Sequence, residues 1–198
     1  MQEVFFQPPS DPVGMALGWV VLGGMVIALA VASWRLTNAW QYGVGITKTR
    51  DPIDSGRGSL VPLLALAGLG ISIYLAYVEV THAEAVCGPI GNCNLVQSSD
   101  YARFMGVPVA ALGIINYVAI GLMWAGLRFA GPQTARLSSL GLLGLTLFGL
   151  LFSIYLTWVE IFILHAICIY CITSAVIATG LMLAVVLPLT GMPAPATD

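Results

Sequence analysis

Five long apolar stretches constrain this chain more than any other feature of its sequence. Each is long enough to cross the roughly 30 Å of hydrocarbon in a bilayer, which takes about 20 helical residues. An unpaired backbone amide in lipid costs several kcal/mol, so helices are the plausible spanning structure, and the alternation typical of barrel strands is absent. We expect an all-α integral membrane protein whose transmembrane helices cover approximately Val13–Trp34, Leu60–Val80, Gly106–Leu127, Ser138–Leu164 and Cys168–Leu187.

The basic residues indicate how the spans are oriented. Cytoplasmic loops of membrane proteins carry an excess of Lys and Arg. Here Arg103 lies on one side, and the other six basic residues lie in the first and third connections: Arg35, Lys48, Arg50, Arg57, Arg128 and Arg136. We therefore expect the N-terminus, the Thr81–Met105 loop and the His165–Ile167 turn outside, and the C-terminus inside. The net charge of −2, without a basic run, gives no indication of nucleic acid as a partner.

Two segments of the sequence resemble each other. GLGISIYLAYVEV (residues 68–80) and GLLFSIYLTWVEI (residues 149–161) align at an offset of 81 residues, and in both a cysteine follows the glutamate after eight residues. Two copies running in the same direction predict a pseudo-twofold axis along the membrane normal. We expect residues 60–187 to form a four-helix bundle. Residues 1–59 would supply an N-terminal tail, an extra helix and a cytoplasmic loop, and residues 188–198 a C-terminal tail.

The four cysteines form two close pairs. Cys87 and Cys93 lie in the outer loop, and Cys168 and Cys171 lie where the last span begins, so both pairs are expected on the outer side, where disulfides persist. A helix N-terminus favours a negative sulfur on Cys168. Cys171 lies one turn deeper on the same face, where a lipid-phase molecule could reach it. The turn-rich residues between Cys87 and Cys93 could move and carry reducing equivalents.

Two static interpretations compete with redox chemistry. Both pairs could be structural disulfides, or the four thiolates could hold zinc. Structural zinc sites cluster at protein knuckles rather than at the start of a transmembrane helix, which disfavours zinc. A CxxC at a helix N-terminus is a known redox arrangement, and a second dithiol facing the same surface favours thiol exchange over static disulfides.

Over Leu60–Leu187 the chain resembles the vitamin K epoxide reductase (VKOR) family, in particular its bacterial members. The resemblance rests on the loop pair Cys87 and Cys93, on Phe104–Pro108, and on the CIYCITS motif of residues 168–174. The combination is specific, whereas either cysteine pair alone would not be. It implies a four-helix bundle around a quinone of the menaquinone, ubiquinone or phylloquinone type, with the outer loop forming a short capping helix over it.

Carried over by motif, the resemblance also implies a role for each cysteine. Cys168 and Cys171 would be the active-site pair, with Cys171 next to the quinone. Cys93 would exchange with Cys168, and Cys87 would receive electrons from a thioredoxin-like partner.

The sequence departs from the family's pattern in two respects. Many bacterial members carry a fused thioredoxin-like domain, but this chain ends at Asp198, so the resemblance implies a separate partner protein in the outer compartment. Vertebrate members have a tyrosine four residues after the second active-site cysteine, implicated in binding the quinone head group. That position is Ala175 here, which offers no side-chain hydrogen bond.

Three further residues are candidates for the quinone site. Asn116 is the only amide deep in the spans, and it could donate to a quinone carbonyl or tie helices together. Phe104 and Met105 are expected to dip the outer loop into the bilayer. There they could close the quinone site or serve as an ordinary interfacial anchor.

Three ionisable residues near the outer surface have two interpretations each. Glu79 and Glu160 could form a relay, because quinone reduction consumes two protons and ionisable groups in spans are often functional. Interfacial carboxylates in contact with water, beside a belt of aromatic residues, are the favoured explanation. His165 could assist the Cys168 thiolate, but a solvated loop histidine is favoured.

The leading hypothesis is a thiol:quinone oxidoreductase in a bacterial plasma (inner) membrane. It would oxidise an outer thioredoxin-like protein, reduce a membrane quinone and support disulfide-bond formation. The alternative is a non-catalytic subunit on the same fold, with structural disulfides, packed into a larger complex. The small residues of the first span would suit packing either on the bundle or on another membrane subunit.

Overall fold

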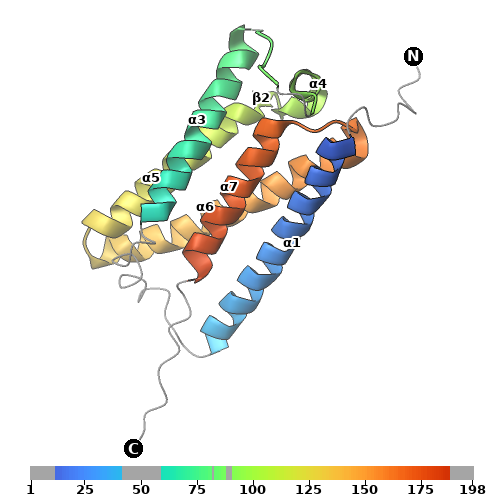
Figure 1. Ribbon diagram of the computed structural model, residues 1–198. Helices are drawn as coiled ribbons and strands as arrows, with labels where there is room; N and C mark the ends of the chain where they lie inside the picture. Colours follow the sequence, from blue (N-terminus) through green and yellow to red (C-terminus); the bar gives the residue numbers. More distant parts are fainter. Residues whose placement is uncertain (1–11, 42–58, 82, 88–90, 188–198) are drawn as a thin grey trace, which may run out of the picture.

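The computed structural model describes residues 12–41, 59–81, 83–87 and 91–187 (Figure 1). Within these ranges five helices are long and apolar enough to cross a membrane, which confirms the predicted all-α membrane fold. Their ends lie within a few residues of most of the predicted limits. The five are α1 (Pro12–Gln41), α3 (Leu60–Thr81), α5 (Val109–Phe129), α6 (Pro132–Val159) and α7 (Ile169–Val186).

Four of these helices form a closed ring. α3 packs against α5, α5 against α6, α6 against α7, and α7 back against α3 (Figure 1). α3 therefore lies across the bundle from α6, and α5 lies across from α7. A twofold axis between the α3–α5 and α6–α7 hairpins produces this same order. The core in the half of the bundle away from the cysteines is built from all four helices and includes Ile120, Leu142 and Leu181.

α1 packs on the outside of this ring, along α7 and α6 (Figure 1). Its Met25 and Ala32 are buried against Leu150, Ala175 and Met182 of the bundle. Small side chains let the helix approach its neighbours closely. The resulting van der Waals packing stabilises helix association in lipid, where the hydrophobic effect does not favour it. Of the two docking options for this helix, the structure shows packing on the chain's own bundle.

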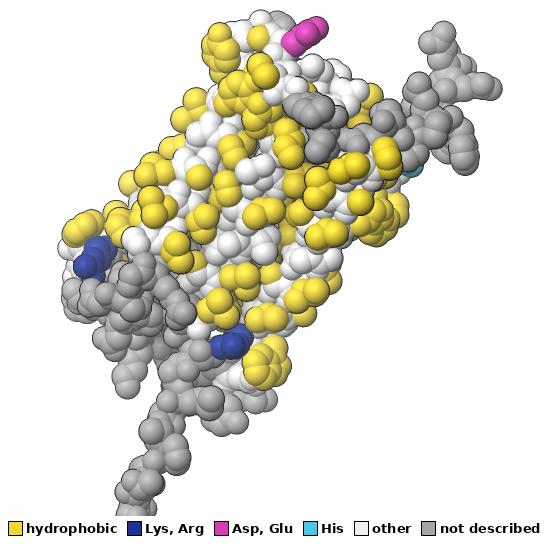
Figure 2. All heavy atoms as spheres, in the orientation of Figure 1, with side chains coloured by type: hydrophobic (Ala, Val, Ile, Leu, Met, Phe, Trp, Pro, Cys, Tyr) yellow, Lys and Arg dark blue, Asp and Glu magenta, His cyan; other side chains and the backbone are white. Residues whose placement is uncertain are grey.

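The surface carries apolar side chains over the length of the helices and charged ones at the two ends. In Figure 2 the yellow apolar surface covers the middle of the molecule, with basic side chains at one end and an acidic one at the other. Leu63, Leu66, Ile115 and Leu122 are each more than 60% exposed. Contiguous apolar surface of this extent is typical of contact with lipid.

Three of the predicted span boundaries differ clearly from the structure: α1 continues past the predicted Trp34 to Gln41, and the third and fourth spans begin at other residues than predicted. A short hairpin precedes α5, with strands β1 (Arg103–Phe104) and β2 (Val107–Pro108) joined through Met105 and Gly106, both at positive φ. Because this turn precedes α5, the third span begins at Val109 and not at the predicted Gly106. The fourth helix begins earlier than predicted, because proline is well suited to the first turn, where its missing N–H has no partner to lose.

The fourth helix ends in a single π-helical turn over Glu160–Leu164. His165, at a φ of 49°, then reverses the chain, and its N–H donates to the carbonyl of Glu160. Widened turns of this kind often occur at functional sites. Here the turn leads directly into Cys168, which caps α7.

Candidate active site

The segment that carries Cys87 is held by two tyrosines from different helices. The N–H of Val86 donates to the hydroxyl of Tyr74 on α3 at 3.0 Å. The carbonyl of Val86 accepts from the hydroxyl of Tyr170 on α7 at 2.7 Å. The two rings lie 5.0 Å apart. Both backbone groups of Val86 are therefore anchored to the bundle, one residue before Cys87.

Cys93 begins the short helix α4 (Cys93–Gln97), which lies at the end of the bundle where α7 begins (Figure 1). The side chain of Asn92 caps this helix by accepting from the N–H of Leu95 at 3.2 Å. The side chain of Asn94 accepts from the N–H of Ala85 at 2.8 Å, which ties the helix to the Cys87 segment. The predicted mobility of residues 88–90 lies outside the described residues.

The four cysteines, all free thiols, form a row in which each contacts the next. The thiol of Cys93 is in hydrogen-bonding contact with Cys87 on one side and with Cys168 on the other. Cys168 in turn contacts Cys171. Cys93 and Cys168 are fully buried, whereas Cys87 and Cys171 at the two ends are partly exposed. The row therefore joins an outer thiol to one inside the bundle.

The environment of these thiols favours their protonated form. Burial, and then contact with Cys93, raises the pKa of Cys87. Contact with Cys168, followed by burial, raises the pKa of Cys93. The pKa of Cys168 is also raised, first by its contact with Cys171. Contact with Cys171 and burial thus oppose the negative sulfur expected on Cys168 at the start of α7.

A cavity of about 100 Å³ lies between the four bundle helices, and Cys171 forms part of its wall. Most of the other wall residues are apolar. Phe148, on the α6 edge, is 53% exposed and stacks on Phe152, with ring centroids 5.8 Å apart. The polar side chains in the wall come from all four helices: Ser72, Asn116, Tyr117, Thr146, Ser153, Thr157 and Ser174.

Two of these polar groups suit a ligand with oxygen atoms. The Oδ1 atom of Asn116 is buried and has no hydrogen-bond partner. Such an orphaned acceptor is costly unless a donor reaches it. The hydroxyl of the neighbouring Tyr117 lies 2.9 Å from Oγ of Ser174, one turn beyond Cys171. A polar ring held at this place could therefore hydrogen-bond beside the sulfur of Cys171.

The other candidates for the quinone site lie in different places. The ring of Phe104 packs edge-on against Phe152 of the wall, with centroids 5.9 Å apart. Met105, at the tip of the hairpin, is 90% exposed. Ala175 is buried against the cluster that contacts α1, and it is not among the residues that line the cavity in the described part of the chain.

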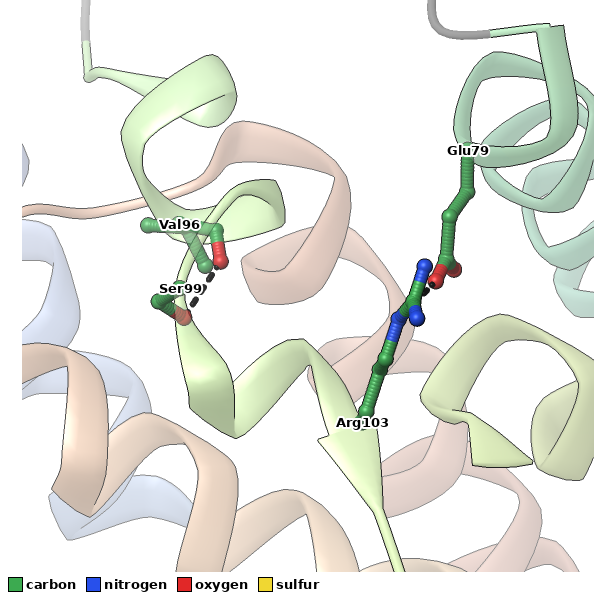
Figure 3. Close-up of polar contacts among 4 residues, drawn as sticks. All are labelled: Glu79, Val96, Ser99 and Arg103. Atoms are coloured by element: carbon green, nitrogen blue, oxygen red, sulfur yellow. Dashed lines mark hydrogen bonds and ion pairs between the residues drawn. The ribbon is translucent and has the colours of Figure 1, made fainter. Parts of the chain in front are cut away.

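The two repeat-related glutamates have different surroundings. Glu79 pairs with Arg103, whose Nε lies 3.2 Å from Glu79 Oε1, across the outer end of the bundle (Figure 3). The neighbouring contact in Figure 3 is the Ser99 hydroxyl donating to the Val96 carbonyl. Glu160 is only 2% exposed, so the expectation that it contacts water is wrong.

Glu160 is buried because it lies at the start of the π turn, where its side chain points into the bundle. Its Oε2 accepts from the N–H of Cys168 at 3.4 Å, and its carboxyl is also in hydrogen-bonding contact with the thiol of Cys171. His165 is exposed, in agreement with a solvated loop histidine.

Sequence reasoning missed Tyr117 and Ser174 as residues of this site. Tyr117 follows Asn116 directly, and both belong to the few polar side chains in α5, a signal that was available in the sequence. Its ring fits over Gly68, where an added Cβ would overlap it. That close approach of α3 and α5 can be seen only in three dimensions.

A helical membrane bundle that gathers two dithiols at one end, beside a cavity among its helices, defines the class of membrane thiol redox proteins. Sequence comparisons assign the family within that class. The profile of the Vitamin K epoxide reductase family matches residues 59–186. The chain therefore belongs to the vitamin K epoxide reductase family.

Three curated relatives support this assignment. The chain is 34% identical over 139 residues to vitamin K epoxide reductase complex subunit 1 of Rattus norvegicus, a match that covers 64% of this chain and 86% of the relative. The Mus musculus protein of the same name is 33% identical over 133 residues, with 61% and 83% covered. Thiol-disulfide oxidoreductase LTO1 of Arabidopsis thaliana is 32% identical over 114 residues, with 54% and 30% covered.

Proposed function

We propose that this protein is a thiol:quinone oxidoreductase that passes electrons from a dithiol protein outside the membrane to a quinone within it. The observation that carries the proposal is the continuous row of thiols from Cys87 to Cys171, with the cavity at its inner end. A relative named as a thiol-disulfide oxidoreductase supports the same chemistry.

The two end contacts of the row, Cys87–Cys93 and Cys168–Cys171, correspond to the two disulfides, and the Cys93–Cys168 contact corresponds to the exchange between them. A thiolate attacks a disulfide sulfur, so exchange requires the three sulfurs involved to come into contact. Cys87 is the outermost and partly exposed member, and it would accept electrons from the partner. Cys93 and Cys168 are buried against each other and would transmit them. Cys171 would hold the electrons at the wall of the cavity.

The residues around the cavity fit a quinone head group. The volume of the cavity is of the same order as that of the roughly 150 Å³ cavity that holds benzene in another protein. The unpartnered Oδ1 of Asn116 would accept from a hydroxyl of the quinol form, and the hydroxyls of the Tyr117–Ser174 pair would donate to a ring oxygen of the quinone. The exposed Phe148 lies where an isoprenoid tail would reach lipid. A bound quinone takes up two electrons and two protons, which matches the two electrons released when the Cys168–Cys171 dithiol closes.

The partner would be a separate thioredoxin-like protein in the outer compartment. The positive-inside distribution of Lys and Arg supports placing the cysteine end of the bundle outside, where such proteins exchange disulfides. Cys87 is the member of the row that a protein thiol can approach.

Anaerobic quinone titration of the reduced, purified protein tests this function. Excess menadione should oxidise all four thiols of the wild type, two for each quinone reduced, measured by thiol counting. The Cys171→Ala variant should fold but lose quinone reduction. Thiols that menadione leaves reduced in the wild type, or disulfides that resist mild reductant, would instead favour the non-catalytic subunit.

A further inference from the structure

Glu160 is a buried carboxyl group placed directly on the reactive pair. Its side chain accepts from the N–H of Cys168 at 3.4 Å and contacts the thiol of Cys171. No basic side chain pairs with it in the described part of the chain, whereas the repeat-related Glu79 pairs with Arg103. A buried carboxylate without a cation is costly, so protonation or strong hydrogen bonding is needed to keep it there.

Glu160 is not among the residues that line the cavity proposed to hold the quinone. It lines a second cavity, of about 60 Å³, and Cys171 is the reactive residue common to both. The second cavity extends toward α4 and the short 3₁₀ helix Asp100–Ala102, and its other titratable wall residues are Glu79 and Tyr101. Glu160 can therefore exchange a proton with Cys171 without touching a molecule in the first cavity.

We propose that Glu160 is the residue that holds the proton of Cys171 while Cys171 is bound in a disulfide, and that returns it when the disulfide opens. This inference rests on the proposed function. It assigns a catalytic role to a carboxyl group, because the group contacts a reacting sulfur.

The proposed cycle balances as follows. When Cys93 Sγ bonds to Cys168 Sγ, the Cys168–Cys171 bond breaks, its electron pair stays on Cys171, and Glu160 protonates that sulfur. Cys87 Sγ then bonds to Cys93 Sγ, which breaks the Cys93–Cys168 bond and leaves its electron pair on Cys168 as a thiolate. When quinone reoxidises the pair, the Cys168–Cys171 bond forms again, two electrons leave, and the Cys171 proton returns to Glu160. The partner's dithiol releases two protons to the outer aqueous phase, and the quinol takes up two from the aqueous phase.

A purely structural role for Glu160 is the competing explanation. Its backbone carbonyl accepts from the N–H groups of His165 and Ala166, and its side chain caps Cys168, so it also shapes the turn. The Glu160→Gln variant separates the two roles. The amide oxygen can still accept from the Cys168 N–H, but the amide cannot take up the proton of Cys171.

The kinetic test compares purified variants in nanodiscs with dithiothreitol as reductant and decylubiquinone as acceptor. Glu160→Gln should lower kcat about 100-fold, within the range known for loss of a proton-transfer group, and leave the KM for decylubiquinone unchanged. The matched control is Glu79→Gln, the same change at the repeat-related position, where the carboxylate pairs with Arg103. The control should keep the wild-type kcat.

A second measurement does not depend on turnover with quinone. Infrared difference spectra between the chemically oxidised and the reduced protein should show a protonated carboxyl band in the oxidised form. That band should be absent in Glu160→Gln and present in Glu79→Gln. If Glu160→Gln does not fold, Glu160→Asp should retain both the band and part of the activity.

The outcomes separate the two proposals. A wild type that does not reduce decylubiquinone refutes the quinone function, and the infrared band then still tests Glu160. A reactive wild type with an equally active Glu160→Gln, or an oxidised form without the carboxyl band, overturns the role of Glu160 alone. A folded Glu160→Asp that lacks both the band and the activity also overturns it.

Discussion

The backbone N–H of Asn92 donates to the carbonyl of Ile167 at 2.8 Å. This single bond joins the outer loop to the turn between α6 and α7, one residue before each of the two buried cysteines, Cys93 and Cys168. Two segments from opposite halves of the repeat are thereby fixed next to each other. Contact between the two cysteine pairs is thus a property of the backbone as well as of the side chains.

Gly91 makes that backbone contact possible, and replacing it should uncouple the two pairs. Gly91 has a φ of +88°, and an added Cβ would overlap the carbonyl oxygen of Ile167. A side chain in this conformation costs about 1–2 kcal/mol before any clash. We expect Gly91→Ala to push the Cys93 helix away from Cys168 and to slow disulfide formation between them.

Cross-linking in a variant without Cys87 and Cys171 measures this effect, because Cys93 and Cys168 are then the only thiols. Gly106→Ala is the matched control, since Gly106 has a φ of +84° but open space where the Cβ would lie. Equal cross-linking rates in both glycine variants would show that the close approach at Ile167 does not position the cysteines.

Asn116→Leu should weaken quinone binding and leave the bundle at least as stable. Its Oδ1 has no partner, so an apolar side chain of similar size removes an unsatisfied buried group. We expect the KM for decylubiquinone to rise about 10-fold, the effect of roughly 1.4 kcal/mol of lost binding. Steady-state kinetics and thermal unfolding together distinguish the two sequence-based interpretations of Asn116.

Val118→Ala, in the same helix but 43% exposed to lipid, is the control and should leave the KM unchanged. A fall in the unfolding temperature of Asn116→Leu with an unaltered KM would show that the amide ties helices together instead.

The reactivity of Cys87 should increase with pH over an alkaline range. Its pKa is raised above the ordinary value of 9.0, chiefly by burial, so the thiol stays protonated at neutral pH. The thiolate is the reactive form, and the alkylation rate should therefore still be rising above pH 9. Iodoacetamide labelling of a variant that keeps Cys87 and Cys93, followed by peptide mass spectrometry, gives the profile.

The raised pKa of Cys87 also makes the free energy of unfolding depend on pH. A raised pKa in the folded state means that the unfolded chain ionises first as pH increases, so the contribution to stability is complete below pH 9 and is lost above it. Reduced protein should accordingly unfold at lower temperature above pH 9 than at pH 7. A labelling profile with its midpoint below the ordinary thiol value would contradict the burial of Cys87.

The Arg103–Glu79 pair should contribute little to stability. Its N–O distance is 3.2 Å, but the Arg103 side chain is 59% exposed, and pairs of this kind typically contribute less than about 1 kcal/mol. A double-mutant cycle with Arg103→Ala and Glu79→Gln, read by thermal unfolding, isolates the pair. The coupling should shrink in high salt, and a large salt-independent coupling would show that the pair is effectively buried.

Much of the fold could be predicted because a bilayer permits few alternatives. Span length and apolar composition predicted five helices. Because the chain crosses the membrane twice between Cys87 and Cys168, both cysteine pairs were predicted at the same end of the bundle. Cys93 contacts Cys168 in the structure, and the exchange between them that the family resemblance implied stays a prediction. These predictions depend on position along the membrane normal, which the sequence reports directly.

Positions around a helix axis were harder to predict. Glu160 lies near the outer end of its span, as expected, but the π turn directs it into the bundle rather than toward water. Ala175 follows Cys171 by four residues, and yet it is buried against the cluster that contacts α1. Both depend on how neighbouring helices pack, for which a single apolar sequence gives little signal.

α1 covers the α6–α7 side of the ring, whereas the exposed Phe148 marks the edge of the larger cavity on α6. The cavity wall at Phe148 therefore faces the lipid on a flank that α1 leaves uncovered. A carrier that enters or leaves the cavity could use this flank. Under the proposed quinone function, turnover would then fall as the reduced form of the carrier accumulates in the membrane.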